Sequence, residues 1–168
     1  FSNAGLNARA TVANMTLAQW SLLIDTHVTG TFNFCQAVLR NMVERNSGSI
    51  VITSSDFAIV GVPNAANYCA AKTALYSLTK SLALEFASHA IRVNAIGPGP
   101  TLKNARQDDH DFQSQVDGLI LKRGPQLAEF GATIRYLWDA RSVTGQMIAL
   151  DGGQHLAWQT PDVTGMVE

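Results

Sequence analysis

The feature that most constrains the fold is a short apolar run, SIVIT at residues 49–53, which is rich in β-branched residues and bounded by turn residues. A continuous apolar run of this length predicts a strand buried on both faces, as in a parallel sheet. Two further runs, IRVNAI at 91–96 and GQMIALDGG at 145–153, predict strands of the same sheet. Because long helical patterns separate these runs, the sequence predicts an α/β fold with a parallel sheet.

The segments between the predicted strands have helical periodicity. Thr16 and Gln19 form the pattern of a capping box, which marks the start of a helix. Apolar residues at helical spacing then predict one long helix over residues 17–45. The same periodicity predicts two more helices, at residues 65–87 and 126–138.

The composition favours a single globular domain. The chain has 168 residues, of which 46% are hydrophobic and 15% are charged, and its formal net charge is -1. Disorder does not fit this composition, and near-neutral charge without a Lys/Arg cluster argues against nucleic acid as a partner. No apolar run reaches the roughly 18 residues of a membrane-spanning helix, so no membrane partner is expected. Cys35 and Cys69 lie in helical patterns, which favours free thiols and a cytoplasmic location.

Polar and glycine-rich turns follow the predicted strands. Ser54 and Ser55 come after the strand at 49–53, and GPGPT (97–101) comes after the strand at 91–96. The segment SNAG (2–5) forms a further turn near the start of the chain. In open parallel sheets, ligands bind beyond the carboxyl ends of the strands. We therefore expect these three turns to meet at one edge of the sheet and to form a binding site there.

Tyr68 and Lys72 lie one turn apart in the helix predicted after this edge. A free tyrosine has a pKa of about 10, and a neighbouring ammonium group favours the phenolate and lowers that pKa. A phenol tuned in this way can exchange a proton with a substrate oxygen, and a serine hydroxyl can hold the same oxygen. The alternative is a half-buried tyrosine beside a lysine whose stem lies on apolar surface. The spacing alone leaves both interpretations open.

Five segments resemble, in order and spacing, the short-chain dehydrogenase/reductase family. They are SNAG (2–5), HVTGTF (27–32), YCAAK (68–72) with Ser55 thirteen residues before its tyrosine, RVNAIGPG (92–99) and TGQMIALDGG (144–153). The resemblance covers nearly the whole chain. It implies a Rossmann-type, doubly wound parallel sheet, of which residues 1–168 would form the C-terminal part of a single domain.

The resemblance also implies a role for each matching residue. Tyr68 would be the general acid/base, Ser55 would polarise the substrate oxygen, and Lys72 would lower the Tyr68 pKa and bind the ribose of a nicotinamide cofactor. The other residues expected to line this cofactor, which is NAD or NADP, are Asn3, Ala4, Gly5, Pro98, Gly99 and Thr101. The implied activity is an NAD(P)-dependent oxidoreductase that interconverts a carbonyl and a secondary alcohol, similar to the 3-oxoacyl-thioester reductases. A homodimer or homotetramer is implied as well.

The chain departs from the family pattern at three places. His27 stands where most members have an asparagine that holds a water of a proton relay, so His27 is a candidate for an altered relay. Thr101 follows Gly99 by two residues, closer than the usual threonine. The family's Gly-rich turn and the residue that selects NAD or NADP do not occur in these 168 residues. We therefore expect the natural protein to be longer, about 250 residues, with N-terminal βαβ units that this chain lacks.

Residues 100–124 are polar with few periodic apolar positions, and we expect an irregular, solvated loop near the substrate. The loop mixes both signs of charge at Lys103, Arg106, Asp108, Asp109, His110 and Asp111. Adjacent acidic residues in a loop make a poor preformed metal site, so no metal is expected. The lone histidines His110 and His155 are expected to be structural or exposed.

Two other kinds of function compete with an active oxidoreductase. One is a catalytically silent relative that serves as a binding or assembly module, or a truncated inactive fragment. The intact set of Ser55, Tyr68 and Lys72 argues against a silent relative. The other is a serine hydrolase built on Ser55, but no Gly-x-Ser-x-Gly elbow surrounds that serine.

Overall fold

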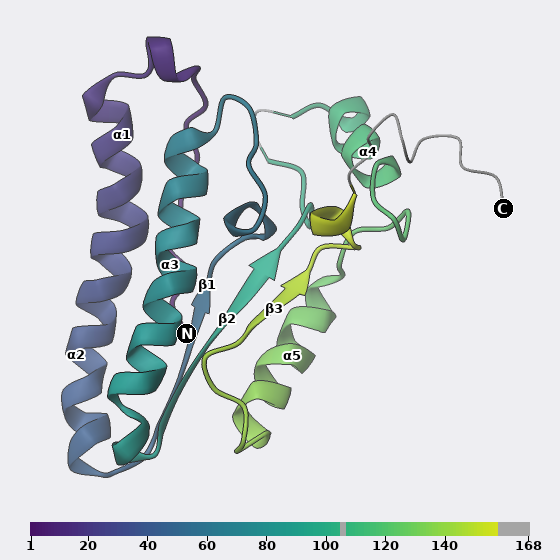
Figure 1. Ribbon diagram of the computed structural model, residues 1–168. Coiled ribbons are helices and arrows are strands. Elements are labelled where there is room, and N and C mark those ends of the chain that lie inside the picture. The colour runs from purple at the N-terminus through teal and green to yellow at the C-terminus, as the bar shows by residue number, and fades with distance from the viewer. Residues whose placement is uncertain (105–106, 158–168) are drawn as a thin grey trace, which may run out of the picture.

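The computed structural model describes residues 1–104 and 107–157. Three parallel strands form one sheet in the order β1 (Gly48–Thr53), β2 (Ile91–Pro98) and β3 (Met147–Leu150) (Figure 1). The α/β class and the parallel sheet are confirmed. β3 is shorter than the predicted strand at 145–153, because Gly145 and Gly152 adopt positive φ angles of 71° and 64° that end the extended conformation.

One face of the sheet is covered by a layer of three helices, α1 (Leu17–Ile24), α2 (Gly30–Glu44) and α3 (Ala66–Glu85). Side chains from α2 and α3 pack against β1 and β2 in the larger apolar core. These β-branched and leucine side chains are shielded from water, which is the main stabilising contribution to such a fold. The residues at its centre are Cys35, Leu39, Ile50, Ile52, Leu75, Leu82, Ile91 and Val93.

The helix predicted as continuous over residues 17–45 is interrupted. Its capping box is confirmed, because Gln19 N–H donates to Thr16 Oγ1 and Thr16 N–H donates to Gln19 Oε1. Residues Asp25–Thr29 then form a π-helical turn, η2, between α1 and α2. A π-turn holds one extra residue per turn and often occurs at functional sites. In this chain it directs His27 into the interior, where only 1% of that residue is exposed.

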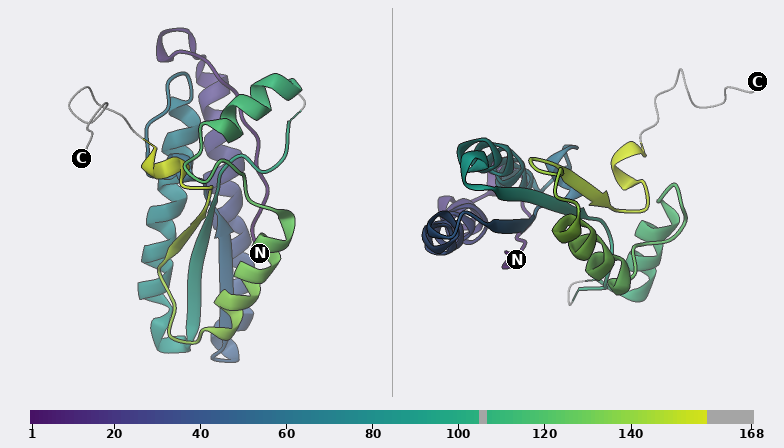
Figure 2. Two further views of the ribbon diagram at one scale, coloured as in Figure 1. Left: turned by 90° about the vertical axis from the view of Figure 1, so that its right-hand side faces the viewer. Right: turned by 90° about the horizontal axis from the view of Figure 1, so that it is seen from below.

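The opposite face of the sheet is covered by α5 (Leu127–Asp139), which packs Leu137 and Phe130 against Val51 and Ile96 (Figure 2). Val51 alternates along β1 with Ile50 and Ile52, so β1 contributes to both cores, as alternating strand residues do. With helices on both faces, the doubly wound arrangement of a Rossmann-like sheet is confirmed.

The segment predicted as an irregular loop at 100–124 contains a helix, α4 (Asp109–Asp117). Asp108 is its N-cap, and its carboxylate accepts a hydrogen bond of 2.7 Å from Asp111 N–H. Arg106, which we placed in this loop, lies outside the described residues. Short helical turns complete the described chain: η1 (Val12–Asn14), η3 (Asp56–Ala58), η4 (Ala87–His89) and η5 (Gln154–Leu156).

The start of the chain lies along the free edge of β1. Ser2 forms a parallel bridge to Ile52: Ser2 N–H donates to Val51 O and Thr53 N–H donates to Ser2 O, each at 2.9 Å. The SNAG turn therefore leaves the same sheet edge as the turns after β1 and β2. Within the described part of the chain, no helix has both the length and the apolar character needed to cross a bilayer.

Candidate active site

The carboxyl ends of β1 and β2 and the first turn of α3 surround a cavity of about 710 Å³. Ser54 N–H donates to Ile96 O at 2.8 Å, which holds the turn after β1 against β2. The expectation that the turns after these two strands meet is confirmed. The residues from these turns and from α3 that line the cavity are Ser55, Asp56, Phe57, Tyr68, Pro98, Gly99, Pro100 and Thr101.

Tyr68 enters the cavity from the first turn of α3. The neighbouring Asn67 is fully buried and fixes this turn, because its Oδ1 accepts from Tyr68 N–H at 2.9 Å and its Nδ2 donates to Ala8 O at 3.1 Å. The ring of Phe57 packs edge-on against the Tyr68 ring at a centroid distance of 6.2 Å. These contacts hold the phenol at one place on the cavity wall.

Burial raises the pKa of the Tyr68 phenol, and the hydrogen bond with Ser55 lowers it by less. The predicted lowering of this pKa by Lys72 is therefore not found. The two residues do share a face of α3, with Lys72 Nζ 5.5 Å from the centroid of the Tyr68 ring. The loss of solvation is the largest cause of the raised pKa, and the nearby charge of Asp56 adds to it, so that the phenol keeps its proton at neutral pH.

Lys72 is almost completely buried behind Tyr68, with 3% of the residue exposed. Its ammonium group donates to Thr53 O at 2.9 Å, and its own backbone carbonyl accepts from Ser54 Oγ at 2.8 Å. Burial lowers the pKa of Lys72 to about 8. The lysine thus ties α3 to the end of β1 and carries its charge at neutral pH.

His27 packs behind Tyr68, with the two rings edge to face at a centroid distance of 5.4 Å. Its Nε2 lies 2.6 Å from Leu6 O and 3.3 Å from Leu6 N. Because the contact with the oxygen is the shorter one, we assign the ring hydrogen to Nε2, which donates to Leu6 O. Burial lowers the pKa of the imidazole, which keeps it neutral. Its Nδ1 is buried and has no hydrogen-bond partner among the described residues.

The residues expected to line the cofactor occupy two places. Pro98, Gly99 and Thr101 line the cavity, and Thr101 Oγ1 donates back to Gly99 O at 3.0 Å. Asn3, Ala4 and Gly5 are exposed and lie outside this cavity, beyond the bridge to β1. Gly5 nonetheless bears on the site, because a Cβ built there would lie 2.7 Å from Cε1 of His27.

Asp56 is a site residue that the sequence interpretation missed. It follows Ser55 directly, only 2% of it is exposed, and it lines the cavity beside Tyr68. Its Oδ1 accepts from Ser55 Oγ and from Phe57 N–H, each at 2.9 Å. The sequence signal that could have identified Asp56 is a carboxylate next to a serine at the end of a predicted parallel strand.

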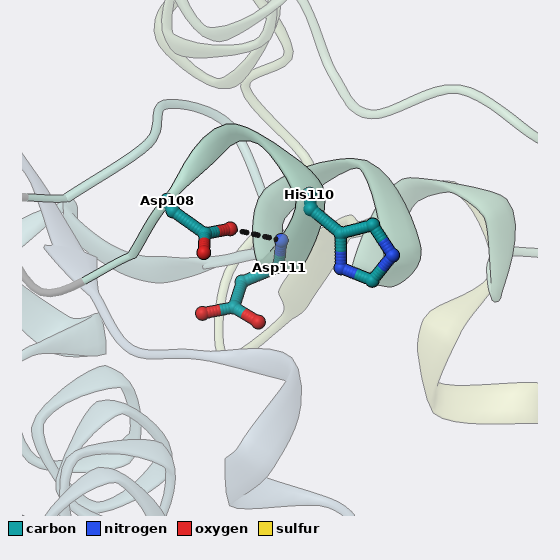
Figure 3. A group of neighbouring side chains, drawn as sticks. All are labelled: Asp108, His110 and Asp111. Atoms are coloured by element: carbon teal, nitrogen blue, oxygen red, sulfur yellow. Dashed lines mark hydrogen bonds between the residues drawn. The ribbon is translucent and has the colours of Figure 1, made fainter.

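The acidic part of the 100–124 segment brings Asp108, His110 and Asp111 close together at the start of α4 (Figure 3). One potential ligand atom from each residue lies within 4.8 Å of the others, and all three residues are exposed. The Asp108 carboxylate already serves as the N-cap of α4. This N-cap role explains the acidic residue at position 108. Both histidines noted above fit the expectation that they are structural or exposed: His110 is exposed, and His155 is partly buried and bonds Asp151 through Nδ1 at 2.6 Å.

Comparison with known proteins places this site in context. A family model described as Enoyl-(Acyl carrier protein) reductase matches residues 1–155. The 3-oxoacyl-[acyl-carrier-protein] reductase FabG of Staphylococcus epidermidis is 34% identical over 160 residues, which are 92% of this chain and 65% of the relative. The chain thus spans 65% of the length of this curated relative.

Solved structures give the same relationship. The structure of FolM Alternative dihydrofolate reductase 1 from Brucella suis in complex with NADP is 42% identical, with a TM-score of 0.90. The match covers 96% of this chain and 65% of that one. A 3-oxoacyl-[acyl-carrier protein] reductase with bound NAD from Brucella melitensis is 32% identical, with a TM-score of 0.83, and the match covers 92% of this chain and 60% of that one.

Proposed function

The chain belongs to the short-chain dehydrogenase/reductase family, and from this we propose that its protein is an NAD(P)-dependent oxidoreductase. The reaction is the interconversion of a carbonyl and a secondary alcohol by hydride transfer. In this proposal residues 1–168 form the C-terminal portion of a single Rossmann-type domain. The observation that carries the proposal is the arrangement of Ser55 and Tyr68 on one cavity wall with the Lys72 ammonium against the Tyr68 ring.

The residues around Lys72 fit a nicotinamide cofactor. The ammonium group has three N–H donors, and within the described part of the chain one of them is used on Thr53 O, which leaves two for the hydroxyls of a ribose. Pro98, Gly99 and Thr101 are at the cavity wall where the nicotinamide would be held. When bound, the cofactor supplies or accepts the hydride.

Tyr68 supplies the proton for carbonyl reduction in this mechanism. Burial raises the pKa of its phenol, so the neutral, proton-donating form dominates at neutral pH. Ser55 borders the same cavity and orients the reacting oxygen by a hydrogen bond. A proton donor positioned in this way contributes roughly 100- to 10,000-fold to a rate. Lys72 keeps its positive charge below about pH 8 and stabilises negative charge that develops on the phenol.

His27 takes the relay position behind Tyr68. Since its hydrogen is on Nε2 toward Leu6 O, its buried Nδ1 is left as an acceptor. A neutral imidazole with a free lone pair can accept a hydrogen bond from water, and so can bind the water that most family members hold with an asparagine at this position. His27 therefore replaces that relay group and does not need to become charged.

The first substrate candidate is a 3-oxoacyl thioester, which the 34% identity to a 3-oxoacyl-[acyl-carrier-protein] reductase supports. The second is a dihydrofolate, supported by 42% identity to FolM Alternative dihydrofolate reductase 1 over 96% of the chain. Both are small-molecule substrates that would enter the cavity beside Tyr68. Polar side chains from Asn7, Arg9, Gln107 and Gln115 line the same cavity and would contact the part of the substrate away from the reacting atoms.

The test is a substrate panel with the full-length protein. An acetoacetyl thioester, dihydrofolate and a set of secondary alcohols are each supplied with NAD(H) or NADP(H), and absorbance of the reduced nicotinamide is followed. Turnover of one class, with Tyr68→Phe as the inactive control, supports the proposal. Cofactor binding without turnover of any class would favour the silent binding module, and absence of binding would favour an inactive fragment.

Self-association through α2 and α3 is part of the proposal. A groove of about 550 Å³ lies along these helices, and its apolar lining includes Phe32, Leu39 and Phe86. Phe32 is 47% exposed, although burial of such a ring in an interface would be favourable. A dimer or tetramer measured by sedimentation, and weakened by Phe32→Glu, would support this.

Cys35 and Cys69 are both free thiols, which supports a cytoplasmic location.

A further inference from the structure

The cavity wall carries a positive charge that the proposed mechanism does not use. Arg9 lines the same cavity as Ser55 and Tyr68, and among the described residues it is the only cationic side chain of the lining. We infer that Arg9 binds an anionic oxygen group, a carboxylate or a phosphate, on the part of the substrate away from the reacting carbon, so that the protein prefers acidic substrates. This inference deepens the proposed function of the same site and rests on it.

The backbone on both sides of Arg9 is bonded to the segment that carries the proposed proton donor. Ala8 O accepts from Asn67 Nδ2, and Ala10 N–H donates to Asn64 O, each at 3.1 Å. Asn67 is fully buried and directly precedes the tyrosine of the site. The backbone of the arginine is therefore held at a defined place relative to that tyrosine.

The guanidinium group of Arg9 is available to a ligand. Within residues 1–104 and 107–157 it forms neither an ion pair nor a hydrogen bond, and Arg9 is exposed. A guanidinium group stays charged at neutral pH and has five N–H donors. These donors can therefore be offered to a bound molecule.

The two carboxylates on the cavity wall leave this charge unpaired. Asp56 is nearly completely buried, and its Oδ1 accepts from Ser55 Oγ and from Phe57 N–H. Asp111 is exposed on α4, and no ion pair joins it to Arg9 in the described structure. An anionic group of the substrate would supply the missing counter-charge.

The rest of the lining fits a substrate that extends beyond its reacting carbonyl. Phe57, Leu102 and Phe112 give the cavity apolar surface, and its volume of about 710 Å³ suits a whole small molecule. A carboxylate or phosphate can accept two parallel N–H bonds from a guanidinium group, which fixes its orientation and adds affinity. We expect a substrate with its carbonyl at Tyr68, an apolar part against these side chains and its anionic group at Arg9.

Both substrate candidates carry an anionic oxygen group at a distance from the reacting carbon. Dihydrofolate ends in the carboxylates of a glutamate, and the carrier of a 3-oxoacyl thioester contains phosphate. The chemistry that Arg9 would recognise is shared by the two. The test therefore treats the two sources separately.

The test uses matched pairs of compounds that differ in the anionic group. One pair is dihydrofolate and its dimethyl ester, and the other is acetoacetyl coenzyme A and acetoacetyl-N-acetylcysteamine, which lacks the phosphates. For the full-length wild-type protein, kcat/KM should be about tenfold higher for the acidic member of the pair that is turned over. In Arg9→Gln this preference should disappear, mainly through a higher KM for the acidic member, and in Arg9→Lys part of it should remain. Arg135→Gln, which removes an exposed arginine charge on α5, should keep the wild-type preference.

A second measurement does not depend on activity. In calorimetry with the same compounds, the wild type should bind the acidic member of one pair about tenfold more tightly than the neutral member, and Arg9→Gln should not. The pair that shows this preference identifies the group as a carboxylate or a phosphate. The preference should shrink as salt is added, because exposed charges are screened. Thermal unfolding should show that Arg9→Gln is as stable as the wild type, since an exposed side chain without partners contributes little to stability.

The outcomes separate the inference from the proposed function. A ratio of acidic to neutral member that is the same in wild type and Arg9→Gln would overturn the inference and leave the oxidoreductase intact. A wild-type protein that binds neither acidic compound would overturn the inference as well. A wild-type protein that turns over no carbonyl or alcohol with either cofactor would overturn the proposed function, whereas a calorimetric preference that depends on Arg9 would still support the binding of an anionic group.

Discussion

Two regions of the molecule bury polar side chains in opposite ways. Beneath the end of α5, the Arg92 guanidinium donates to the carbonyls of Leu137, Trp138, Ala140 and Val143. The fully buried Asn94 is bonded at both ends, through Nδ2 to Val143 O and through Oδ1 from Gln146 N–H. Around Tyr68, by contrast, His27 Nδ1, Thr53 Oγ1 and Asp56 Oδ2 are buried without a hydrogen-bond partner among the described residues.

The difference separates a structural network from a functional one. An unpaired buried polar atom costs about 1–3 kcal/mol, so a fold that satisfies its polar atoms elsewhere does not leave several together without a reason. The Arg92 region uses its polar groups to hold the end of α5 on β2. The Tyr68 region keeps acceptors available for a substrate, a proton or a water. The predictions below test this contrast in order of decreasing effect.

The largest expected effect is that of Tyr68→Phe. The substitution removes the proton donor and keeps the ring that packs against His27 and Phe57. We expect turnover to fall by about 100-fold or more, with cofactor affinity and stability little changed. Steady-state rates on the best substrate, cofactor titration and thermal unfolding of the full-length protein provide the measurements. Near-normal turnover would contradict the role of Tyr68.

Arg92→Met tests the satisfied region. It removes the donors to four backbone carbonyls at the end of α5 and in the following turn, so we expect a loss of about 3 kcal/mol in the free energy of unfolding. Specific activity of the folded protein should stay near wild type, because this network lies on the opposite face of the sheet from α3.

The control for Arg92→Met is Arg135→Met. Arg135 is an exposed arginine on α5 for which no hydrogen bond or ion pair is found among the described residues. Its replacement should change stability by less than about 0.5 kcal/mol. Equal effects of the two substitutions in urea unfolding would show that the buried network contributes little.

The contrast also separates what can be predicted from sequence. The strands were predicted because β-branched apolar runs such as 49–53 are buried on both faces, and the main helices because their apolar residues recur at helical spacing. Helix α4 was missed because it is mostly exposed and only Phe112 and Val116 of its residues are partly buried. The π-turn at Asp25–Thr29 was missed because its extra residue leaves the apolar spacing of the helix nearly unchanged.

The residues of the site also divide into those that could be predicted from the sequence and those that could not. Ser55, Tyr68 and Lys72 could be placed near one another from their spacing, because a helix turn and a strand end fix where such residues lie, and their expected roles came from the family resemblance. We predicted a lowered pKa for Tyr68, and this direction was wrong, because spacing reveals a neighbouring charge but not the degree of burial. Asp56 was missed for the same reason, since its importance depends on a buried oxygen that lacks a hydrogen-bond partner within residues 1–104 and 107–157.

The third prediction concerns stability and pH at Asp56. Its folded pKa, about 6, lies above the ordinary value of 3.8, so the folded state binds more protons between these pH values. Wild-type stability should therefore fall as pH rises through this window, whereas Asp56→Asn carries no charge to bury. By pH ~7 the variant should be more stable than wild type by up to about 2 kcal/mol.

Thermal unfolding of the full-length protein from about pH 4 to about pH 7 measures this difference. Asp139→Asn, which removes an exposed carboxylate at the end of α5, is the matched control for the loss of one aspartate charge. A gap between Asp56→Asn and wild type that stays constant across the window would mean that Asp56 does not titrate there.

The smallest expected effect comes from Gly5→Ala, which perturbs the site without removing any of its polar groups. The added Cβ would lie 2.7 Å from His27 Cε1, so the imidazole must shift against the Tyr68 ring. A small displacement of the phenol should slow turnover by roughly 3- to 10-fold. Gly61→Ala, whose Cβ meets nothing within 4 Å, should leave the rate unchanged. If Gly5→Ala slows turnover no more than Gly61→Ala, the contact between His27 and Tyr68 does not position the phenol.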